Sequence, residues 1–315
     1  MIVKTLQGLE PVLAAELEAL GASDIRPLKR AVSCEGDLRL MYRINYEART
    51  ALRVLQPLHS FQASDERQFY HRVYDIDWSQ YLSASDTLAI DATVASVHFR
   101  HSQYMALLTK DAIVDQFRDR IGRRPSVNVE APSLRIHLRI HGSQCDLLLD
   151  SSGDSLHKRG YRRDIVEAPI NEVLAAGMIL LSEWNGKGPF VDPMCGSGTL
   201  AIEAAMIAMR MPPQHKREAF GFFRWKNFDK KLWNTVKTEA DAQIQQPDFP
   251  ILASDKDPRA RNATAINLLS AGLEQVVHVE KMPFEKLEPP EIPGVLITNP
   301  PYDERLKVDE IAAFY

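Results

Sequence analysis

The alternation of apolar and polar positions divides the first half of the chain into two parts. Residues 1–58 show helical spacing, then a short strand, then helical spacing again, as expected of a small α+β element. Its predicted elements are a helix over Leu9–Leu20, a strand over Ala31–Cys34 and a helix over Gly36–Leu55. Residues 59–155 alternate strand-like runs around one amphipathic helix, which indicates an α/β module. Its predicted elements are strands over Thr87–Val94, Leu134–Ile140 and Gln144–Asp150 and a helix over Met105–Ile121.

From residue 156 onward, short apolar runs alternate with helical segments. This order indicates a parallel sheet, because each helix carries the chain back to the start of the next strand. The predicted strands are a short one from Phe190, then Pro250–Ser254, Val276–Glu280 and Gly294–Thr298, and the predicted helices are Ile170–Trp184, Thr199–Met209 and Asp257–Ala271. Open sheets of this kind bind ligands at the carboxyl ends of their strands.

The strand from Phe190 runs into a glycine turn, Asp192-Pro193-Met194-Cys195-Gly196-Ser197-Gly198. Glycines let backbone N–H groups approach a ligand closely, and the N-terminus of the following helix favours a carboxylate or another anion. The spacing is not Gly-x-Gly-x-x-Gly, and the turn has no phosphate-binding Lys. The turn therefore favours a cofactor other than a nicotinamide dinucleotide or a nucleoside triphosphate.

An acidic residue, Asp255, ends the second strand. It could accept hydrogen bonds from both hydroxyls of a ribose, as acids at this place do in dinucleotide sites. It could equally cap the helix over Asp257–Ala271. Asp192 and Asp255 are 63 positions apart, against about 20 in a compact dinucleotide unit. Residues Met211–Gln246 must therefore be an insertion.

The fourth strand ends in Asn299-Pro300-Pro301-Tyr302. Each proline fixes its own φ and keeps the preceding residue out of the helical region, so Asn299 leaves the strand in a fixed direction. The Asn299 side-chain oxygen and the Pro300 carbonyl can then accept both hydrogens of a planar amine, and Tyr302 offers a ring on which a flat base stacks. The pattern favours methyl transfer to an exocyclic amine. Taken alone, it is equally compatible with a plain proline turn.

In combination, these motifs carry a resemblance. Asp-Pro-x-x-Gly-Ser-Gly, then an acid after the second strand, then Asn-Pro-Pro-Tyr resembles the S-adenosylmethionine-dependent amino methyltransferases. Further segments resemble the THUMP-domain RNA methylases, namely Thr5–Gly21, Gly36–Leu38, Arg49–Leu58, Lys110–Asp115 and Ser152–Arg162. Within that family, the chain is most similar to the bacterial 23S ribosomal RNA guanine-N2 methyltransferases.

The resemblance implies an α/β protein of three domains. Residues 1–58 would form a ferredoxin-like α+β element, and residues 59–155 a THUMP-like RNA-binding module. Residues 156–315 would form a Rossmann-like class I methyltransferase sheet. The chain ends 13 residues after Tyr302, whereas the complete sheet of this family has three further strands. We therefore expect the chain to be truncated after its fourth strand.

The resemblance also implies S-adenosylmethionine as the cofactor and 23S ribosomal RNA, or an assembly intermediate of it, as the partner. The implied reaction is in-line methyl transfer to the exocyclic N2 amine of a guanine flipped out of its RNA fold. The residues expected to act in catalysis are Asn299, Pro300 and Tyr302. Those expected to hold the cofactor are Asp192, Pro193, Cys195, Gly196, Ser197, Gly198, Asp255 and Phe284.

The third strand departs from the pattern of the family, which has an acid after it to contact the adenine amino group. Here the segment reads Lys281-Met282-Pro283-Phe284. We expect the backbone to contact the adenine instead, with Phe284 against the ring.

The net charge of -4 argues against binding a polyanion over the whole surface, so RNA contacts must come from a local basic face. The residues expected to bind RNA are Arg100, His101, Lys110, Lys158, Arg159, Arg162 and Arg163. The Lys158–Arg163 cluster could also be a linker, and the arginines from Arg118 to Arg124 could form a solvated helix face.

The three cysteines, Cys34, Cys145 and Cys195, are too few and too scattered for a disulfide framework or a zinc site. We expect Cys34 and Cys145 to be buried, Cys195 to pack within its loop near the cofactor, and no metal. No apolar run reaches the about 20 residues that span a bilayer, and Met1–Leu20 resembles the start of an amphipathic helix rather than a signal segment. The sequence therefore predicts a cytoplasmic protein.

Several alternatives remain open. A transfer-RNA guanine-N2 methyltransferase would share every motif. A DNA adenine or protein glutamine methylase also uses Asn-Pro-Pro-Tyr, although the Arg-rich N-terminal half favours RNA. A chain this short could also be a non-catalytic RNA-binding fragment. Within the insertion, the aromatic and basic run Phe220–Lys226 could hold a base, but we expect it to pack as a lid over the sheet edge.

Overall fold

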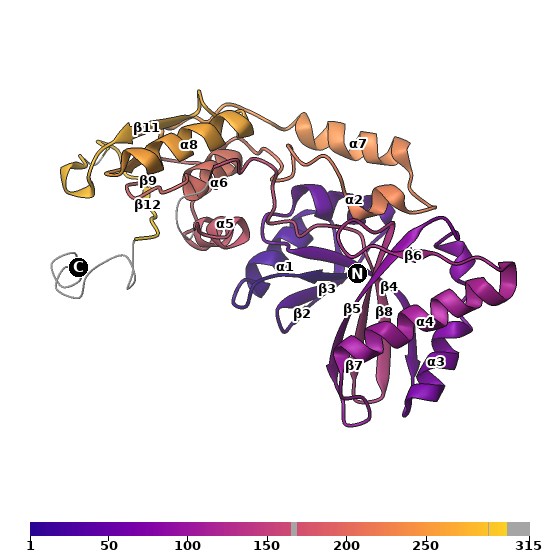
Figure 1. Cartoon of the computed structure of the whole chain (residues 1–315). Coiled ribbons are helices and arrows are strands. Elements are labelled where there is room, and N and C mark those ends of the chain that lie inside the picture. The colour runs from indigo at the N-terminus through magenta and orange to yellow at the C-terminus, as the bar shows by residue number, and fades with distance from the viewer. Residues whose placement is uncertain (165–168, 289, 301–315) are drawn as a thin grey trace. The chain divides into compact units, whose positions relative to one another are not determined.

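The computed structural model describes residues 1–164, 169–288 and 290–300 of the 315-residue chain. The chain forms two compact units. The first contains Met1–Leu156 and Arg217–Thr238, and the second contains His157–Lys216 and the residues from Glu239 onward. The chain therefore passes between the units three times, which can be followed by colour in Figure 1.

An eight-stranded mixed sheet runs through the first unit. In their order across the sheet, its strands are β2 (Ser23–Leu28), β3 (Ala31–Glu35), β1 (Ile2–Lys4), β4 (Arg53–Gln62), β8 (Gln144–Asp150), β7 (Leu134–His141), β5 (Thr87–Ala95) and β6 (Ser126–Val127). β5 runs parallel to both of its neighbours, and the other pairs are antiparallel. Because β4 pairs with β1 on one side and β8 on the other, the two N-terminal parts expected from the sequence share one sheet.

The structure corrects the secondary structure expected at two N-terminal positions. Ile2–Lys4 is a strand rather than the start of a helix, and it pairs with both β3 and β4. The helix expected over Gly36–Leu55 ends at Glu47, because the backbone of Ala48 is extended, with ψ 126°. Arg53–Gln62 then forms β4. Pairing with two strands outweighs the helical spacing of this segment, since tertiary contacts override local propensity.

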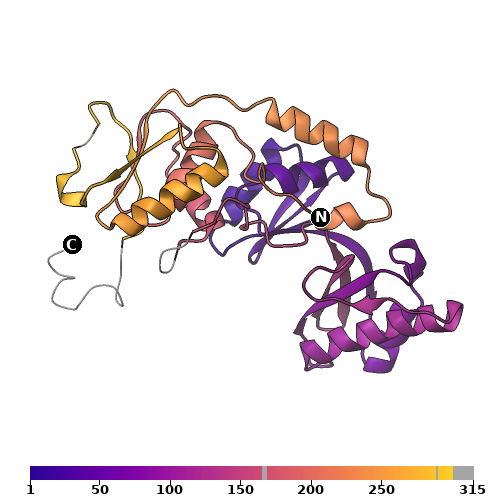
Figure 2. The same cartoon turned by 45° about the horizontal axis from the view of Figure 1, so that its top comes forward.

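Helices pack on this sheet at several places. They are α1 (Glu10–Ala19), α2 (Leu38–Glu47), α3 (Glu66–Tyr74), α4 (Ser102–Ile121) and the short η1 (Trp78–Gln80). α1 lies on β2 and β3, α2 on β4 and α4 on β5, and α3 lies beside α4 in both views (Figures 1 and 2). Asp37 and Asp65 cap α2 and α3 by accepting hydrogen bonds from backbone N–H groups of their first turns.

Residues 217–238 of the insertion belong to the first unit. They contain η2 (Gly221–Arg224) and most of α7 (Lys230–Asp241). The ring of Phe222 lies 4.5 Å from that of Tyr42 in α2, and the ring of Trp233 lies 5.5 Å from that of Tyr46. The backbone N–H of Asp229 donates to the Tyr42 hydroxyl over 3.0 Å. The aromatic run therefore packs, as expected, but on α2 rather than over the edge of the second sheet.

Within its described residues, the second unit has a four-stranded parallel sheet. In order across the sheet, its strands are β11 (Val277–Lys281), β10 (Ile251–Asp255), β9 (Phe190–Asp192) and β12 (Val295–Leu296). Its helices are α5 (Glu172–Leu181), α6 (Thr199–Ala208), α8 (Pro258–Ala271) and the short η3 (Phe284–Lys286). The sequence therefore predicted the elements of this unit near their true positions.

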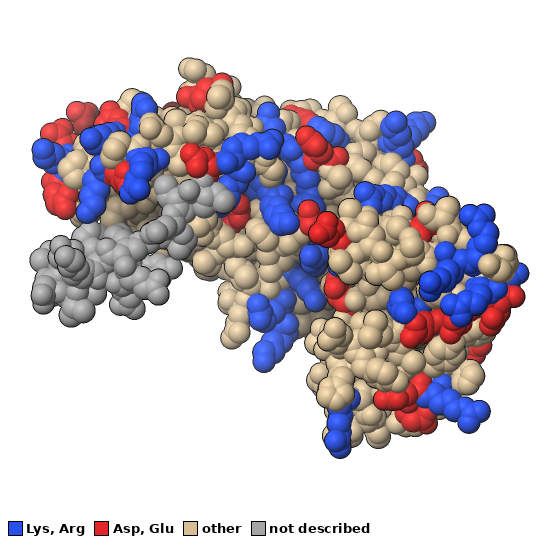
Figure 3. Space-filling view, viewed as in Figure 1, with Lys and Arg blue, Asp and Glu red and all other residues tan. Residues whose placement is uncertain are grey.

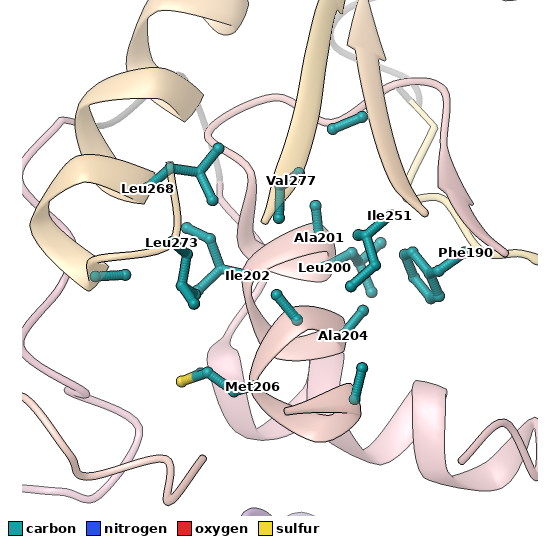
Figure 4. Packing of buried hydrophobic residues seen from close by; sticks show 14 of the residues in the cluster. Phe190, Leu200, Ala201, Ile202, Ala204, Met206, Ile251, Leu268, Leu273 and Val277 are labelled. Atoms are coloured by element: carbon teal, nitrogen blue, oxygen red, sulfur yellow. The ribbon is translucent and has the colours of Figure 1, made fainter. Parts of the chain in front are cut away.

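The core of the second unit lies between α6 and the sheet. Figure 4 shows Leu200 and Ala201 of α6 turned toward Ile251 and Phe190 of the central strands, while Ile202 faces the α8 side. All five of these side chains are at most 2% exposed. Small alanines in α6 let it approach the sheet closely, and this places the N-terminus of the helix next to the strand ends.

The strand order positions the candidate site. β9 is the first strand of this sheet in the chain, β10 and β11 lie on one side of it, and β12 returns to the other side. The order of strands therefore reverses beside β9. In open α/β sheets, ligands bind outside the carboxyl ends of the strands at such a reversal.

No helix in the described ranges is long and apolar enough to cross a membrane.

Candidate active site

The glycine turn is held against β10 and α8. The backbone N–H of Cys195 donates to the carbonyl of Ser254 over 2.9 Å, and the Thr264 hydroxyl donates to the carbonyl of Gly196 over 2.9 Å. Gly198 has φ +83°, and a Cβ there would lie 2.7 Å from Cγ2 of Thr264. Only glycine fits this position, so the turn lies as close to α8 as a backbone can.

Asp255 ends β10, and its carboxylate is fixed by two backbone groups. Oδ2 accepts from the N–H of Gly196 over 3.0 Å, and Oδ1 accepts from the N–H of Asp257 over 2.9 Å. The cap of α8 is Asp257, which accepts from the N–H of Arg259. The alternative role of Asp255 as the helix cap is therefore excluded. Each oxygen keeps a second lone pair, so the half-buried carboxylate can still accept from a ligand.

Asp192 ends β9 and is buried, with 1% of its surface exposed. Burial raises the pKa of its carboxyl to about 7, although the Thr298 hydroxyl donates to Oδ1 over 3.0 Å. Asp192 therefore lies beneath the turn and anchors the residue that precedes Asn299.

Asn299 and Pro300 are half-buried and follow Thr298, just beyond the end of β12 at Leu296. Pro301 and Tyr302 lie outside the described residues, so the catalytic role expected of Tyr302 stays a prediction. Phe284 is 44% exposed in η3, beyond the carboxyl end of β11.

Asp192, the glycine turn and Asp255 are therefore close in space, and their chemistry can be compared with that of the expected cofactor. α6 begins at the turn, has no acid in its first turn and receives no side-chain cap from the residues described. Its free N–H groups fit an anionic end of a ligand. The Asp255 carboxylate fits the hydroxyls of a ribose. Asp192, Pro193, Cys195, Gly196, Ser197 and Gly198 form the turn between these two features.

Cys34 and Cys145 are free and buried, as expected, and Cys195 is free and buried as well. Burial raises the pKa of the Cys195 thiol, and its sulfur lies 3.4 Å from the Thr264 hydroxyl. Cys195 therefore packs the turn rather than acting as a nucleophile. Among the residues described, no group of three His, Cys, Asp or Glu side chains is placed to hold a metal.

The four basic residues of the Lys158–Arg163 cluster were expected to bind RNA, but two of them, Arg159 and Arg162, bond within the protein. Arg159 is 1% exposed, and its Nε lies 3.3 Å from Oε1 of the equally buried Glu203 in α6. A buried guanidinium that is paired inside the core does not reach RNA, so Arg159 is removed from the RNA-binding set. Arg162 is 17% exposed and points toward the glycine turn. Lys158 and Arg163 are exposed, which leaves them as RNA-binding candidates.

The other basic residues lie in the first unit. Arg100 and His101 are exposed at the start of α4. Lys110 lies further along the same helix, where it pairs with Asp111. Arg118 and Arg120 pair with Asp115 and Asp77 over 2.9 and 2.8 Å, and Figure 3 shows blue and red side chains together over α4. These two arginines fit the solvated helix face considered above.

Sequence reasoning missed three residues that shape the site. They are Thr264 and Asn267 of α8 and Thr298 after β12. Thr264 and Asn267 are buried polar side chains in an apolar stretch of helix, and that pattern was the available signal. Their partners lie about 70 positions away, so spacing alone could not identify them.

Three family models match the chain in succession. Residues 1–55 match the RlmL ferredoxin-like domain, residues 63–150 match the THUMP domain, and residues 159–315 match the RMKL-like methyltransferase domain.

Individual relatives with similar sequences are also RNA methyltransferases by name. The chain is 42% identical to "Ribosomal RNA large subunit methyltransferase K/L" of Syntrophotalea carbinolica over 98% of its length, but it spans only 45% of that relative. It is 39% identical to "Putative RNA methyltransferase slr0064" of Synechocystis sp., covering 98% of this chain and 81% of that protein.

A solved structure, described as "SMU.472, a putative methyltransferase complexed with SAH", superposes with a TM-score of 0.87 and 34% identity. The match covers 99% of this chain and 83% of that one. The fold of both units, the glycine turn and the sequence matches agree, and the chain belongs to the family of THUMP-domain RNA methyltransferases.

Proposed function

We propose that this chain binds S-adenosylmethionine in its second unit and transfers the methyl group to the exocyclic N2 amine of a guanine in 23S ribosomal RNA. The observation that carries the proposal is the hydrogen bond between Thr298 and Asp192. It joins the segment after β12, which carries Asn299 and Pro300, to the end of β9, where the glycine turn begins. A cofactor on the turn and an amine at Asn299 would then be neighbours. The SAH-bound relative and the ribosomal RNA methyltransferases among the relatives support the same proposal.

The proposed roles follow from donor and acceptor chemistry. When bound, the cofactor supplies an electrophilic methyl group. The turn and the start of α6 hold its carboxylate, Asp255 accepts from its ribose hydroxyls, and exposed Phe284 packs on its adenine. The side-chain oxygen of Asn299 and the carbonyl oxygen of Pro300 each accept a hydrogen bond from the amine. These two bonds direct the lone pair of the amine nitrogen toward the methyl group. We propose that Tyr302 stacks on the base.

No metal ligand or covalent nucleophile has a part in this proposal. Guanine N2 is a weak nucleophile because its lone pair is delocalised into the ring. Positioning two bound reactants supplies several kcal/mol toward such a step.

We further propose the domain roles implied by the resemblance. Residues 1–58 form a ferredoxin-like element, residues 59–155 bind RNA as a THUMP domain, and residues 156–315 carry out the transfer. Arg100, His101 and Lys110 contact RNA from the first unit, and Lys158 and Arg163 contact it from the segment at the start of the second unit. We propose that the protein acts in the cytoplasm.

The test is a methylation assay of the 315-residue chain with tritium-labelled cofactor and three separated substrates: 23S ribosomal RNA, 16S ribosomal RNA and bulk transfer RNA. The proposal predicts label in 23S RNA and its recovery as N2-methylguanosine after nuclease digestion. Label in transfer RNA would favour the transfer-RNA alternative. RNA binding without transfer or SAH binding would instead favour the non-catalytic alternative.

A further inference from the structure

The segment His157–Asp164 begins the second unit, and it is connected to Ser197 of the glycine turn directly and through Asn267. We call this segment the linker. Asn267 of α8 makes the first connection between the linker and the turn. Its side chain is fully buried, and both the oxygen and the nitrogen of its amide form hydrogen bonds. Oδ1 accepts from the backbone N–H groups of Arg163 and Asp164 over 2.7 and 3.0 Å. Nδ2 donates to the carbonyls of Asp164 and Ser197 over 2.8 and 3.0 Å.

Arg162 makes the second connection between the linker and the turn. Its Nε donates to Oε1 of Glu172 over 2.8 Å, which ties it to the start of α5. The other two nitrogens donate to the hydroxyls of Ser197 and Thr199 over 3.2 and 3.0 Å, and to the carbonyl of Ile170 over 3.1 Å. The planar guanidinium group of Arg162 therefore bonds to the first turn of α5, the first turn of α6 and the glycine turn at the same time.

The charge of Arg162 is the wrong sign for stabilising α6. A helix N-terminus carries a partial positive charge, so a cation beside it is unfavourable. Glu172 offsets the charge of Arg162 but lies on α5, not on α6. We therefore attribute the presence of an arginine at position 162 to the conformation of the glycine turn rather than to the stability of α6.

From these bonds, we infer that Asn267 and Arg162 are positioning residues that hold the glycine turn in its cofactor-binding form. The inference rests on the proposed function, since it concerns the same cofactor. The Asn267 amide fixes the Ser197 carbonyl, and Arg162 fixes the two hydroxyls on either side of Gly198. Without these bonds, the turn can relax away from the conformation in which its N–H groups converge on a ligand.

The test compares Asn267→Leu with Asn45→Leu, using SAH as the probe in calorimetry at a temperature where circular dichroism shows both variants folded. Asn45 is a matched control in the first unit, because it is also fully buried and bonds to Met41, Ser151 and Ser152. Both variants should unfold at lower temperature than the wild-type chain. Only Asn267→Leu should raise the dissociation constant of SAH, by at least tenfold. Equal SAH affinity in the two variants would overturn the inference.

Arg162→Lys is the second variant, and it keeps the inference testable if Asn267→Leu does not fold. Lys keeps the charge but cannot donate to Glu172, Ser197 and Thr199 together. We expect a tenfold weaker SAH affinity and a raised KM for the cofactor, with kcat preserved at saturating cofactor. Arg43→Lys, at a guanidinium paired with Glu47 in α2, should leave SAH affinity unchanged. If Arg162→Lys binds SAH like wild type, the inference is wrong; if the wild-type chain binds no SAH, the proposed function itself fails.

Discussion

The hydroxyl of Thr298 donates a 3.0 Å hydrogen bond to Oδ1 of Asp192, although the two residues are 106 positions apart in the chain. The backbone pairing of β12 with β9 is short: Val295 and Leu296 lie opposite Phe190 and Val191, and the N–H of Ile297 donates to the carbonyl of Val191 over 3.0 Å. The side-chain bond therefore extends a short strand pair to the residue before Asn299. In this way the sheet fixes the direction in which the Asn-Pro segment leaves it.

Thr298→Val tests this relationship, because Val keeps the branched shape and removes the hydroxyl. The buried oxygen of Asp192 then loses a donor. The free energy of unfolding at pH 7 should fall by about 1–3 kcal/mol. Thr298→Ser keeps the hydroxyl and loses a methyl group, and should cost about 1 kcal/mol. Urea unfolding of both variants gives the comparison, and equal losses would mean that the bond contributes nothing.

The raised pKa of Asp192 predicts how stability depends on pH. Burial raises this pKa from 3.8 to about 7. Over that range the unfolded chain has lost a proton that the folded chain keeps, so the unfolded state binds fewer protons. The free energy of unfolding therefore decreases as pH rises from about 4 to 7, and the decrease is complete above the folded pKa. A shift of this size corresponds to about 4 kcal/mol.

Asp192→Asn isolates that contribution, because the amide stays neutral and its oxygen can still accept from Thr298. We expect the variant to gain about 4 kcal/mol relative to the wild-type chain between pH 4 and pH 8. Taking the difference between the two proteins removes the titration of every other group. Urea unfolding across this range measures it, and a difference that stays constant with pH would show that Asp192 is charged in the folded state.

Asn299→Ala separates catalysis from binding. The proposed acceptor acts on the amine mainly as its nitrogen changes hybridisation, so its loss should fall on the transition state. We expect kcat to fall by about 10²–10³, while SAH affinity stays the same. Single-turnover assays with labelled cofactor measure the rate. Transfer at the wild-type rate would mean that Asn-Pro is only a turn.

Asp255→Ala tests the ribose acceptor. The change removes the carboxylate that faces the site and its bonds to the N–H groups of Gly196 and Asp257. SAH should bind about 1–3 kcal/mol more weakly in calorimetry. Asp257→Ala is the matched control, because it removes the cap of α8 and should cost about 1 kcal/mol of stability. Equal SAH affinity in the two variants would contradict the assignment.

The sequence predicted the second sheet well, because its elements depend on local signals. Glycine turns, strand-end acids and helix caps act within a few residues of one another, as Asp257 does for α8. The motifs at Asp192, Asp255 and Asn299 could therefore be assigned to strand ends from the order of residues alone. Parallel topology then brings strand ends together.

The sequence did not predict which basic side chains form ion pairs within the protein instead of facing RNA. Arg159 and Arg162 resemble an RNA-binding cluster because they lie among other basic residues. Glu203 of α6, which is 44 positions away, neutralises Arg159, and Glu172 at the start of α5 neutralises Arg162. Strand β4 was missed for a similar reason, since its partners in β1 and β8 decide its conformation. For Arg159 and β4 the deciding contacts are far away in the chain, and neither spacing nor composition reports them.

Gly198→Ala measures how closely the glycine turn must approach α8. A left-handed residue with a Cβ costs about 1–2 kcal/mol in itself, and at Gly198 the new Cβ would also lie 2.7 Å from Thr264. Gly142→Ala is the control, because Gly142 has φ +60° and nothing within 4 Å of an added Cβ. We expect Gly198→Ala to lose more stability than Gly142→Ala and to weaken SAH binding at least tenfold.

The double variant Gly198→Ala with Thr264→Ser then identifies the cause. Removing the Thr264 methyl group leaves room for the new Cβ, so the two changes together should cost less than the sum of the single changes. Thermal unfolding and SAH calorimetry on the four proteins of this cycle provide the measurement. Strict additivity would mean that the left-handed backbone alone, and not contact with α8, requires glycine at this position.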